Sequence, residues 1–229
     1  MFYEKQNIFP SLDVCAEALA KNMAMDLLSL RKQVFIALSG GKTPRVILPK
    51  LASKVGIDWK RVTVILTDER WVPPSSLESN ARVVQECFLS KGAKNCHFFG
   101  LWSKTKSRED VCTFTDINIK EAIQSLDIVY LGMGEDGHIA SLFPARESHH
   151  FESSHSFCVL STAKNSPKKR VSLSLSALLN ARTIYLQFSG AKKYAVYLEA
   201  LKTKPTSKLP VSLLLSSKHP DLNIYIAIK

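Results

Sequence analysis

The chain has 229 residues, of which 45% are hydrophobic and 22% charged, so it is long enough to bury a full core without disulfide or metal cross-links. Its net charge is +11, but the basic residues are scattered, with no arginine-rich tail or zinc finger, and no apolar run reaches the length of a membrane span. These properties exclude the usual nucleic-acid-binding and membrane classes, and leave either a solvated basic surface or the attraction of a small anion, which can coexist.

Helical and extended patterns alternate along the first half of the chain. Apolar residues recur every three or four positions behind the candidate N-cap Ser11, which predicts a helix. The expected elements are, in order, a helix over 11–31, a strand over 34–38, a helix over 44–54, a strand over 62–66, a long loop to 79, a helix over 80–89, a short strand over 97–101, a helix over 114–124 and a strand over 127–131.

The second half continues this alternation with one interruption. The expected elements are strands over 157–160 and 170–174, a short helix over 176–181, a strand over 183–188, a helix over 191–202 and a last strand over 222–228. Strands that alternate with helices predict an α/β fold with a doubly wound, mainly parallel, Rossmann-like sheet. The block 145–180 departs from the alternation, so we interpret 1–229 as a single domain with 145–180 as a small flanking subdomain.

Cysteine usage indicates a reducing compartment. The five cysteines form no CxxC pair, and Cys96–His97 has no second ligand pair at zinc spacing. We therefore expect free thiols and no metal site. The segment Met1–Asn7 lacks the basic start and apolar stretch of a signal peptide, which favours a cytoplasmic location.

The segment 131–144 carries the densest chemical pattern. It follows a short apolar run with the composition of a buried strand, and its three glycines, Gly134 among them, allow tight turns and close approach of a ligand. Asp136 and His138 lie at the carboxyl end of this strand, where open α/β sheets bind ligands. Histidine is the usual proton carrier near neutral pH. For these two side chains alone, a tight turn capped by Asp136 explains the pattern equally well.

A second loop of this kind follows the strand over 34–38 and runs directly into the next helix. It consists of Ser39, Gly40, Gly41, Lys42 and Thr43. Free N–H groups at a helix start favour an anion, and a bound phosphate would explain why Lys42 and Arg45 stand where the helix dipole disfavours cations. A Walker A motif needs glycine five residues before Gly41, where Ile36 stands, so nucleotide binding is excluded by register. An ordinary turn with exposed basic residues is the alternative.

Two further strand ends carry charged side chains. Asp68 and Arg70 follow the strand over 62–66, where Arg70 can bind a phosphate or carboxylate with both arms of its guanidinium and Asp68 can contact sugar hydroxyls or hold Arg70. A salt-bridged loop is the alternative. Lys193, next to Lys192, opens the helix after the strand over 183–188, and Arg170 begins a strand of its own, so both are candidate ligands of the same anion.

Together these loops resemble the 6-phosphogluconolactonase family, in the glucosamine/galactosamine-6-phosphate isomerase superfamily. The matching segments occur in the family's order: SGGKTP, TDERWVP followed by Ser79–Asn80, GMGEDGHIASLFP, Arg170–Leu173 and SGAKK. Ser141–Pro144 has the lactonase form, whereas the related deaminases carry an Asn-Glu pair there. Lys42 replaces the small hydroxyl residue that is usual in the family.

The resemblance implies a carboxylic ester hydrolase that opens 6-phospho-D-glucono-1,5-lactone in the oxidative pentose phosphate pathway, without metal or organic cofactor. In this scheme His138 carries the proton, Asp136 orients His138, and backbone amides of the loop around Gly134 receive the developing oxyanion. The phosphate would lie on the 39–43 loop. The remaining substrate contacts would be Asp68, Arg70, Arg170 and Lys193, and the sequence leaves open which cation meets the phosphate.

Two alternatives belong to other function classes. An amino-sugar-phosphate deaminase or isomerase is disfavoured by the missing glutamate. A non-catalytic sugar-phosphate sensor is disfavoured by His138 and Asp136, because a pure binding pocket needs no proton carrier. The expected partner is therefore a small phosphorylated lactone, with no nucleic acid and no membrane, bound by a monomer or weak homo-oligomer.

Overall fold

A seven-stranded sheet forms the centre of the computed structural model, which describes residues 5–30, 32–119, 125–144 and 156–229. All neighbouring strands of this sheet run parallel. From edge to edge they are β1 (Lys5–Phe9), β10 (Leu222–Ala227), β9 (Thr183–Ser189), β6 (Ile128–Gly132), β2 (Val34–Leu38), β3 (Val62–Leu66) and β5 (His97–Phe99). The doubly wound parallel α/β fold predicted from the sequence is confirmed.

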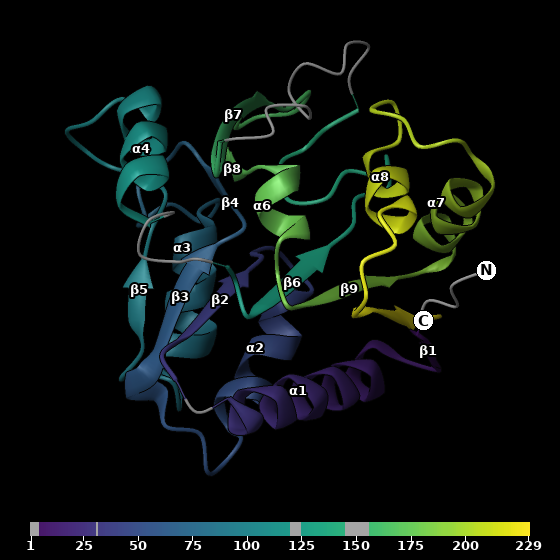
Figure 1. Cartoon of the computed structure of the whole chain (residues 1–229), viewed down its shortest axis with the longest axis horizontal. Coiled ribbons are helices and arrows are strands. Elements are labelled where there is room, and N and C mark those ends of the chain that lie inside the picture. The colour runs from purple at the N-terminus through teal and green to yellow at the C-terminus, as the bar shows by residue number, and fades with distance from the viewer. Residues whose placement is uncertain (1–4, 31, 120–124, 145–155) are drawn as a thin grey trace.

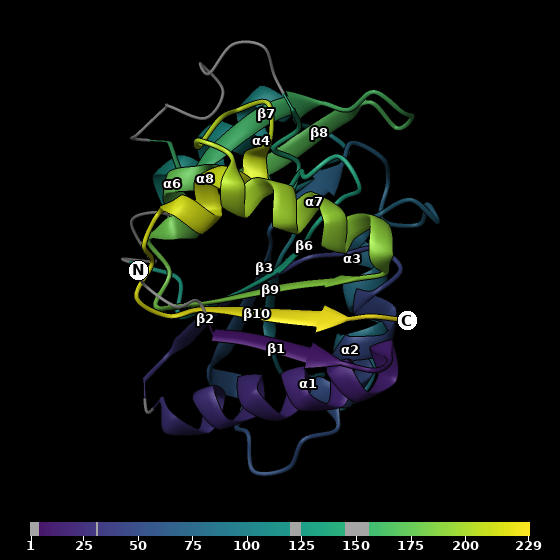
Figure 2. The same ribbon diagram turned by 90° about the vertical axis from the view of Figure 1, so that its right-hand side faces the viewer.

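Helices cover both faces of the sheet, which is why its central strands are nearly continuous apolar runs (Figures 1 and 2). On one face lie α1 (Leu12–Ser29), α2 (Pro44–Ala52) and α3 (Asn80–Val84), the last continued by a π-helical turn, Gln85–Leu89. On the other face lie α6 (Leu175–Leu179), α7 (Ala191–Lys202) and α8 (Pro210–Ser216). No helix within the described ranges is long and apolar enough to cross a bilayer.

A second, antiparallel sheet lies beside α6 above the main sheet (Figure 1). Its strands, in spatial order, are β4 (Asp68–Arg70), β8 (Lys169–Leu173) and β7 (Cys158–Thr162), and α4 (Arg108–Phe114) packs on β7 before continuing to Ile119. In this sheet β7 and β8, which come from the block 145–180, pair with β4, which follows β3 in the chain. Residues 145–155 of that block lie outside the described residues, and its separate subdomain status stays a prediction.

The strand order creates a switch point between β2 and β6. From β2 the chain moves through β3 to β5 on one side, and it then returns to place β6 on the other side of β2. Ligands of open α/β sheets bind at the carboxyl ends of strands at such a point. The loops after β2 and β6, which are the two glycine-rich loops of the sequence, therefore border the same crevice.

Four features of the fold differ from the expectation. The strands β1 and β4 and the helix α8 were not expected, because each is short and carries no clear periodicity. The helix expected over 114–124 begins earlier, at Arg108, because Ser107 and Asp110 form a reciprocal capping box there. Residue 31 and residues 120–124, where two helices were expected to end, lie outside the described residues.

Candidate active site

Two adjoining cavities lie at the carboxyl edge of the main sheet, with volumes of about 280 and 270 Å³. They share Asp68, Arg70, His138 and Ala140 in their walls. The first, the loop cavity, is completed by Ser39–Pro44, Asn80, Gly132, Met133, Gly134, Gln187 and Lys193. The second, the hairpin cavity, is completed by Asp136, Ser141, Phe143, Pro144, Thr162–Asn165 and Arg170. Every site residue proposed from the sequence therefore lines at least one of the two cavities.

In the loop after β6, the His138 side chain packs against the backbone of Gly134. Gly134 N–H donates to the His138 carbonyl at 2.9 Å, and Gly137, with φ +77°, closes the turn by donating to the Gly134 carbonyl at 3.2 Å. A Cβ atom on Gly134 would lie 2.2 Å from the His138 Nδ1 atom, so the imidazole occupies the space that any side chain there would need. The unexpected helix α8 supports this turn, because Val211 N–H donates to the Gly137 carbonyl at 2.9 Å.

Asp136 fixes the imidazole of His138. The His138 Nδ1 atom lies 2.5 Å from the Asp136 Oδ1 atom, which also accepts from the His138 backbone N–H at 3.2 Å. Burial alone would raise the pKa of Asp136, but the hydrogen bonds and charge of His138 outweigh it and hold the pKa below its usual value. The His138 Nε2 atom bonds no residue within the described part of the chain, which leaves it available to a water or substrate.

The loop after β2 is pinned at its start and open at its end. Ser39 N–H donates to the Tyr130 carbonyl at 3.2 Å, which ties this loop to β6. Gly40 packs so closely on Asn80 that a Cβ atom would lie 2.3 Å from the amide oxygen, and Gly41 has a φ of +109°. The Thr43 side chain caps no N–H group of α2. The start of α2 is therefore free to meet an anion.

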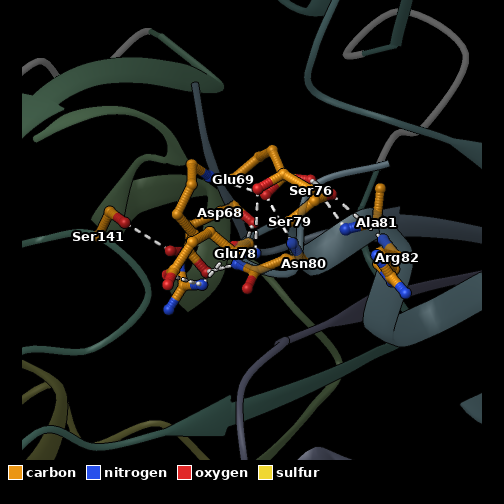
Figure 3. Close-up of polar contacts among 10 residues, drawn as sticks. Asp68, Glu69, Ser76, Glu78, Ser79, Asn80, Ala81, Arg82 and Ser141 are labelled. Atoms are coloured by element: carbon orange, nitrogen blue, oxygen red, sulfur yellow. Dashed lines mark hydrogen bonds and ion pairs between the residues drawn. The ribbon is translucent and has the colours of Figure 1, made fainter. Parts of the chain in front are cut away.

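Asp68 lies at the junction of the two cavities with most of its hydrogen-bonding capacity used. Its carboxylate accepts from the Thr67 hydroxyl at 3.3 Å. It also accepts from the Asn80 amide at 3.2 Å and from the Ser141 hydroxyl (Figure 3). Ionised carboxylates only accept hydrogen bonds, and three donors already converge on this one. The arrangement holds Asp68 in one orientation beside the substrate space.

The neighbouring carboxylate, Glu69, faces the start of α3 instead of the cavities. It is fully buried and accepts from the backbone N–H groups of Arg70, Asn80 and Ala81 at 2.7–2.8 Å and from the Ser79 hydroxyl at 3.0 Å (Figure 3). Burial raises the pKa of Glu69, and these hydrogen bonds partly oppose the shift. Glu69 therefore caps α3 and supports Asn80.

Of the basic residues at helix starts, some face the cavities and others face solvent. Lys193 is half-buried in the loop cavity, where burial lowers its pKa and Glu135 opposes the shift. Its neighbour Lys192 is exposed, with its Nζ atom 3.8 Å from the Glu135 carboxylate. Arg45 pairs with Glu86 at 3.0 Å and, like Lys192, lines neither cavity, so Glu86 and not a bound phosphate accounts for the position of Arg45.

Several cavity residues were not singled out in the sequence. Asn80 belongs to one of the matching motifs but is not among the predicted site residues. In the structure it lines the loop cavity, and its amide oxygen is buried without a hydrogen-bond partner. Gln187 is buried with neither amide atom paired, at the end of β9. A glutamine in the otherwise apolar strand was a local signal for it. In the described part of the chain no three His, Cys, Asp or Glu side chains gather as metal ligands.

Comparison with known proteins gives a consistent result over almost the whole chain. A model of the family "Glucosamine-6-phosphate isomerases/6-phosphogluconolactonase" matches residues 10–223. A 6-phosphogluconolactonase from Pseudomonas putida is 34% identical over 220 residues, which cover 92% of this chain and 89% of the relative.

Solved structures agree with this assignment. A 6-phosphogluconolactonase from Shewanella baltica superposes with a TM-score of 0.92 and 30% identity, covering 98% of both chains. A monomeric glucosamine-6-phosphate deaminase superposes with a TM-score of 0.84 at 18% identity, covering 97% of both chains, and this likeness concerns the fold alone. The fold is thus shared by two chemistries, and the closer sequence relation is to the lactonases.

Proposed function

The chain belongs to the glucosamine-6-phosphate isomerase/6-phosphogluconolactonase family, and we propose that it hydrolyses 6-phospho-D-glucono-1,5-lactone to 6-phospho-D-gluconate in the oxidative pentose phosphate pathway. It is a carboxylic ester hydrolase. The observation that carries the proposal is the Asp136–His138 pair, bonded at 2.5 Å, at the junction of two cavities beside the switch point of the sheet.

His138 serves as the base and then as the acid. Its Nδ1 atom is held by Asp136, so Nε2 takes a proton from water while the water oxygen forms a bond to C1 of the lactone. When the bond between C1 and the ring oxygen breaks, the imidazolium returns this proton to the leaving oxygen. The negative charge of Asp136 stabilises the imidazolium between these two steps. Backbone amides around Gly134 are the donors that the sequence suggests for the oxyanion, but the N–H groups of Gly134, Gly137 and His138 are already bonded within the loop.

The phosphate lies in the loop cavity. The 39–43 loop offers an uncapped helix start, Gly40 and Gly41 let the phosphate approach the backbone, and Lys193 is a half-buried cation on the same wall. Lys42, at the mouth of the loop, adds an exposed positive charge that attracts the dianion. Asp68, fixed by its three donors, accepts a sugar hydroxyl with its remaining capacity.

The deaminase alternative is less well supported. Deaminases of this superfamily carry an Asn-Glu pair after the Gly-His-Ile-Ala segment, whereas Ser141 and Leu142 stand here, with the Ser141 hydroxyl bonded to Asp68. The lactone scheme needs no metal, no cofactor and no nucleic acid, and it suits a cytoplasmic enzyme that acts as a monomer or weak homo-oligomer.

A proton-release assay on freshly prepared phosphogluconolactone tests the function. Spontaneous ring opening is subtracted, and we expect enzyme-dependent release that is much slower with unphosphorylated gluconolactone. The same preparation is given glucosamine 6-phosphate, from which we expect no ammonia. Ammonia release without lactone hydrolysis would replace the proposal with the deaminase alternative, and binding of 6-phosphogluconate without either turnover would indicate a sensor.

A further inference from the structure

Two arginines face each other across the small sheet at the wall of the hairpin cavity. Arg70 on β4 and Arg170 on β8 are register partners in the antiparallel pair. Like charges directly opposite in neighbouring strands repel each other, so this pairing is unfavourable by itself. An anion bound between the two guanidinium groups would reverse the sign of that interaction.

Arg170 has no salt-bridge partner among the described residues. The residue is only 8% exposed, and its Nε atom has no hydrogen-bond partner there. Arg70, in contrast, donates to the Glu78 carbonyl and lies 3.8 Å from the Glu78 carboxylate. Burial lowers the pKa of Arg170 most and the charge of Arg70 lowers it further, while the carboxylates of Asp68, Glu69 and Glu78 oppose this shift.

Phe143 connects this pair to the catalytic histidine. The Arg170 guanidinium lies 5.9 Å from the centre of the Phe143 ring, and the His138 ring lies 4.8 Å from the same centre. His138 therefore has the glycine loop with Lys193 on one side and Arg170 on the other, and Arg70 lines the wall that the two cavities share. A substrate that reacts at His138 extends into both cavities.

The product of the proposed reaction is anionic at both ends. The phosphate at C6 is present throughout, whereas the carboxylate at C1 forms only when water adds to the carbonyl, the bond to the ring oxygen breaks and the new acid releases its proton. Because C1 must lie at His138 and the phosphate suits the loop cavity, the second anion forms at the hairpin cavity.

We infer that Arg170, with Arg70 beside it in the wall shared by the two cavities, forms a carboxyl subsite that receives the lactone carbonyl oxygen and then the product carboxylate. The inference rests on the proposed function. Two guanidinium forks match the two oxygens of a carboxylate, and the same donors favour the negative oxygen of the tetrahedral intermediate over the neutral carbonyl. The pair thus contributes to catalysis as well as to binding.

Calorimetry with two ligands that differ only at C1 tests the subsite. 6-Phosphogluconate has a carboxylate there, and D-glucitol 6-phosphate has a neutral CH₂OH group. We expect wild type to bind the carboxylate ligand about ten- to a hundred-fold more tightly, the size of a charge-assisted contact. Arg170→Lys, which keeps the charge but loses the fork, should remove most of this difference while leaving glucitol 6-phosphate affinity within about twofold.

Lys193→Gln is the matched variant on the phosphate side, and it should weaken both ligands by the same factor. If Arg170→Lys also weakens both ligands equally, the arginines bind phosphate and the inference is overturned. If Arg170→Lys does not fold, the wild-type comparison decides, because equal affinity for the two ligands contradicts a carboxyl subsite. If the protein hydrolyses the lactone but binds the two ligands with equal affinity, only the carboxyl subsite is contradicted. If it does not hydrolyse the lactone, the proposed function itself is contradicted.

Discussion

The segments that follow the parallel strands β3 and β6 both carry carboxylates, but these carboxylates have opposite roles. In the segment after β3, Glu69 lies on the short strand β4, is fully buried and receives four hydrogen bonds. In the loop after β6, the Asp136 side chain is 42% exposed and its partner is His138. A carboxylate whose acceptor positions are filled by backbone donors holds the backbone in place. A carboxylate bound to a single histidine instead orients that side chain and stabilises its protonated form.

The two segments also depend on each other. Glu69 fixes the start of α3 and so the position of Asn80, and the Asn80 side chain fills the space beside Gly40 in the phosphate loop. Asn80 and Ser141 together orient Asp68, which borders both cavities. The region after β3 therefore holds the 39–43 loop and the His138 loop in fixed positions relative to each other. Substitutions in this region should affect stability, whereas substitutions at His138 should affect the reaction rate.

Replacing His138 by alanine should have the largest effect. General acid–base catalysis contributes about a hundred- to ten-thousand-fold in rate, so we expect His138→Ala to lose kcat by that factor while binding 6-phosphogluconate almost normally. The measurements are steady-state kinetics and calorimetry on the same preparation. A variant that keeps more than about a tenth of the wild-type kcat would show that another group takes the proton.

A methyl group on Gly134 should displace the imidazole without removing it. The added Cβ atom would lie 2.2 Å from the His138 ring, and a shift of about 1 Å at a reacting group costs roughly a hundred-fold in rate. We expect Gly134→Ala to reduce kcat by about this factor. Gly100→Ala is the control, because its Cβ atom meets only Phe98 at 3.6 Å, outside both cavities. Equal kinetics for the two variants would refute the close packing of His138 on Gly134.

Glu69→Gln should change stability more than chemistry. A glutamine amide can accept with only one of its two terminal atoms, so buried donors around it lose their partner at a cost of about 1–3 kcal/mol each. For a chain of this size we expect Tm to fall by roughly 2–4 °C per kcal/mol, with kcat little changed below the transition. Exposed Glu199→Gln is the control. A loss of kcat at unchanged Tm would move Glu69 into the catalytic machinery.

Chelation should have no effect. The proposed proton transfer uses side chains alone, so incubation with EDTA is expected to leave the lactonase rate unchanged. The measurement is the proton-release assay before and after dialysis, with divalent cations added back. A rate lost in EDTA and restored by one cation would contradict the metal-free scheme.

Local patterns in the sequence were sufficient for the fold class and for many, but not all, of the residues that line the two cavities. Apolar runs of strand length, alternating with amphipathic helices, predict the parallel sheet because both periodicities are properties of neighbouring residues. The glycines around Asp136 and His138 mark a loop at a strand end for the same reason. Twelve proposed site residues line the two cavities because the carboxyl ends of parallel strands meet at one edge.

Only the tertiary structure decided which partner each side chain meets. The strand β1 forms because it pairs with β10 at the other end of the chain, and β4 forms because it pairs with β8, which brings Arg70 opposite Arg170. Adjacent helical residues point about 100° apart, so the orientation of α7 directs Lys193 into the cavity and Lys192 into solvent. Asp68 and Glu69 differ in the same way, because apart from the adjacent Thr67 and Arg70 their donors come from the start of α3 and from Ser141, whose positions no local pattern specifies.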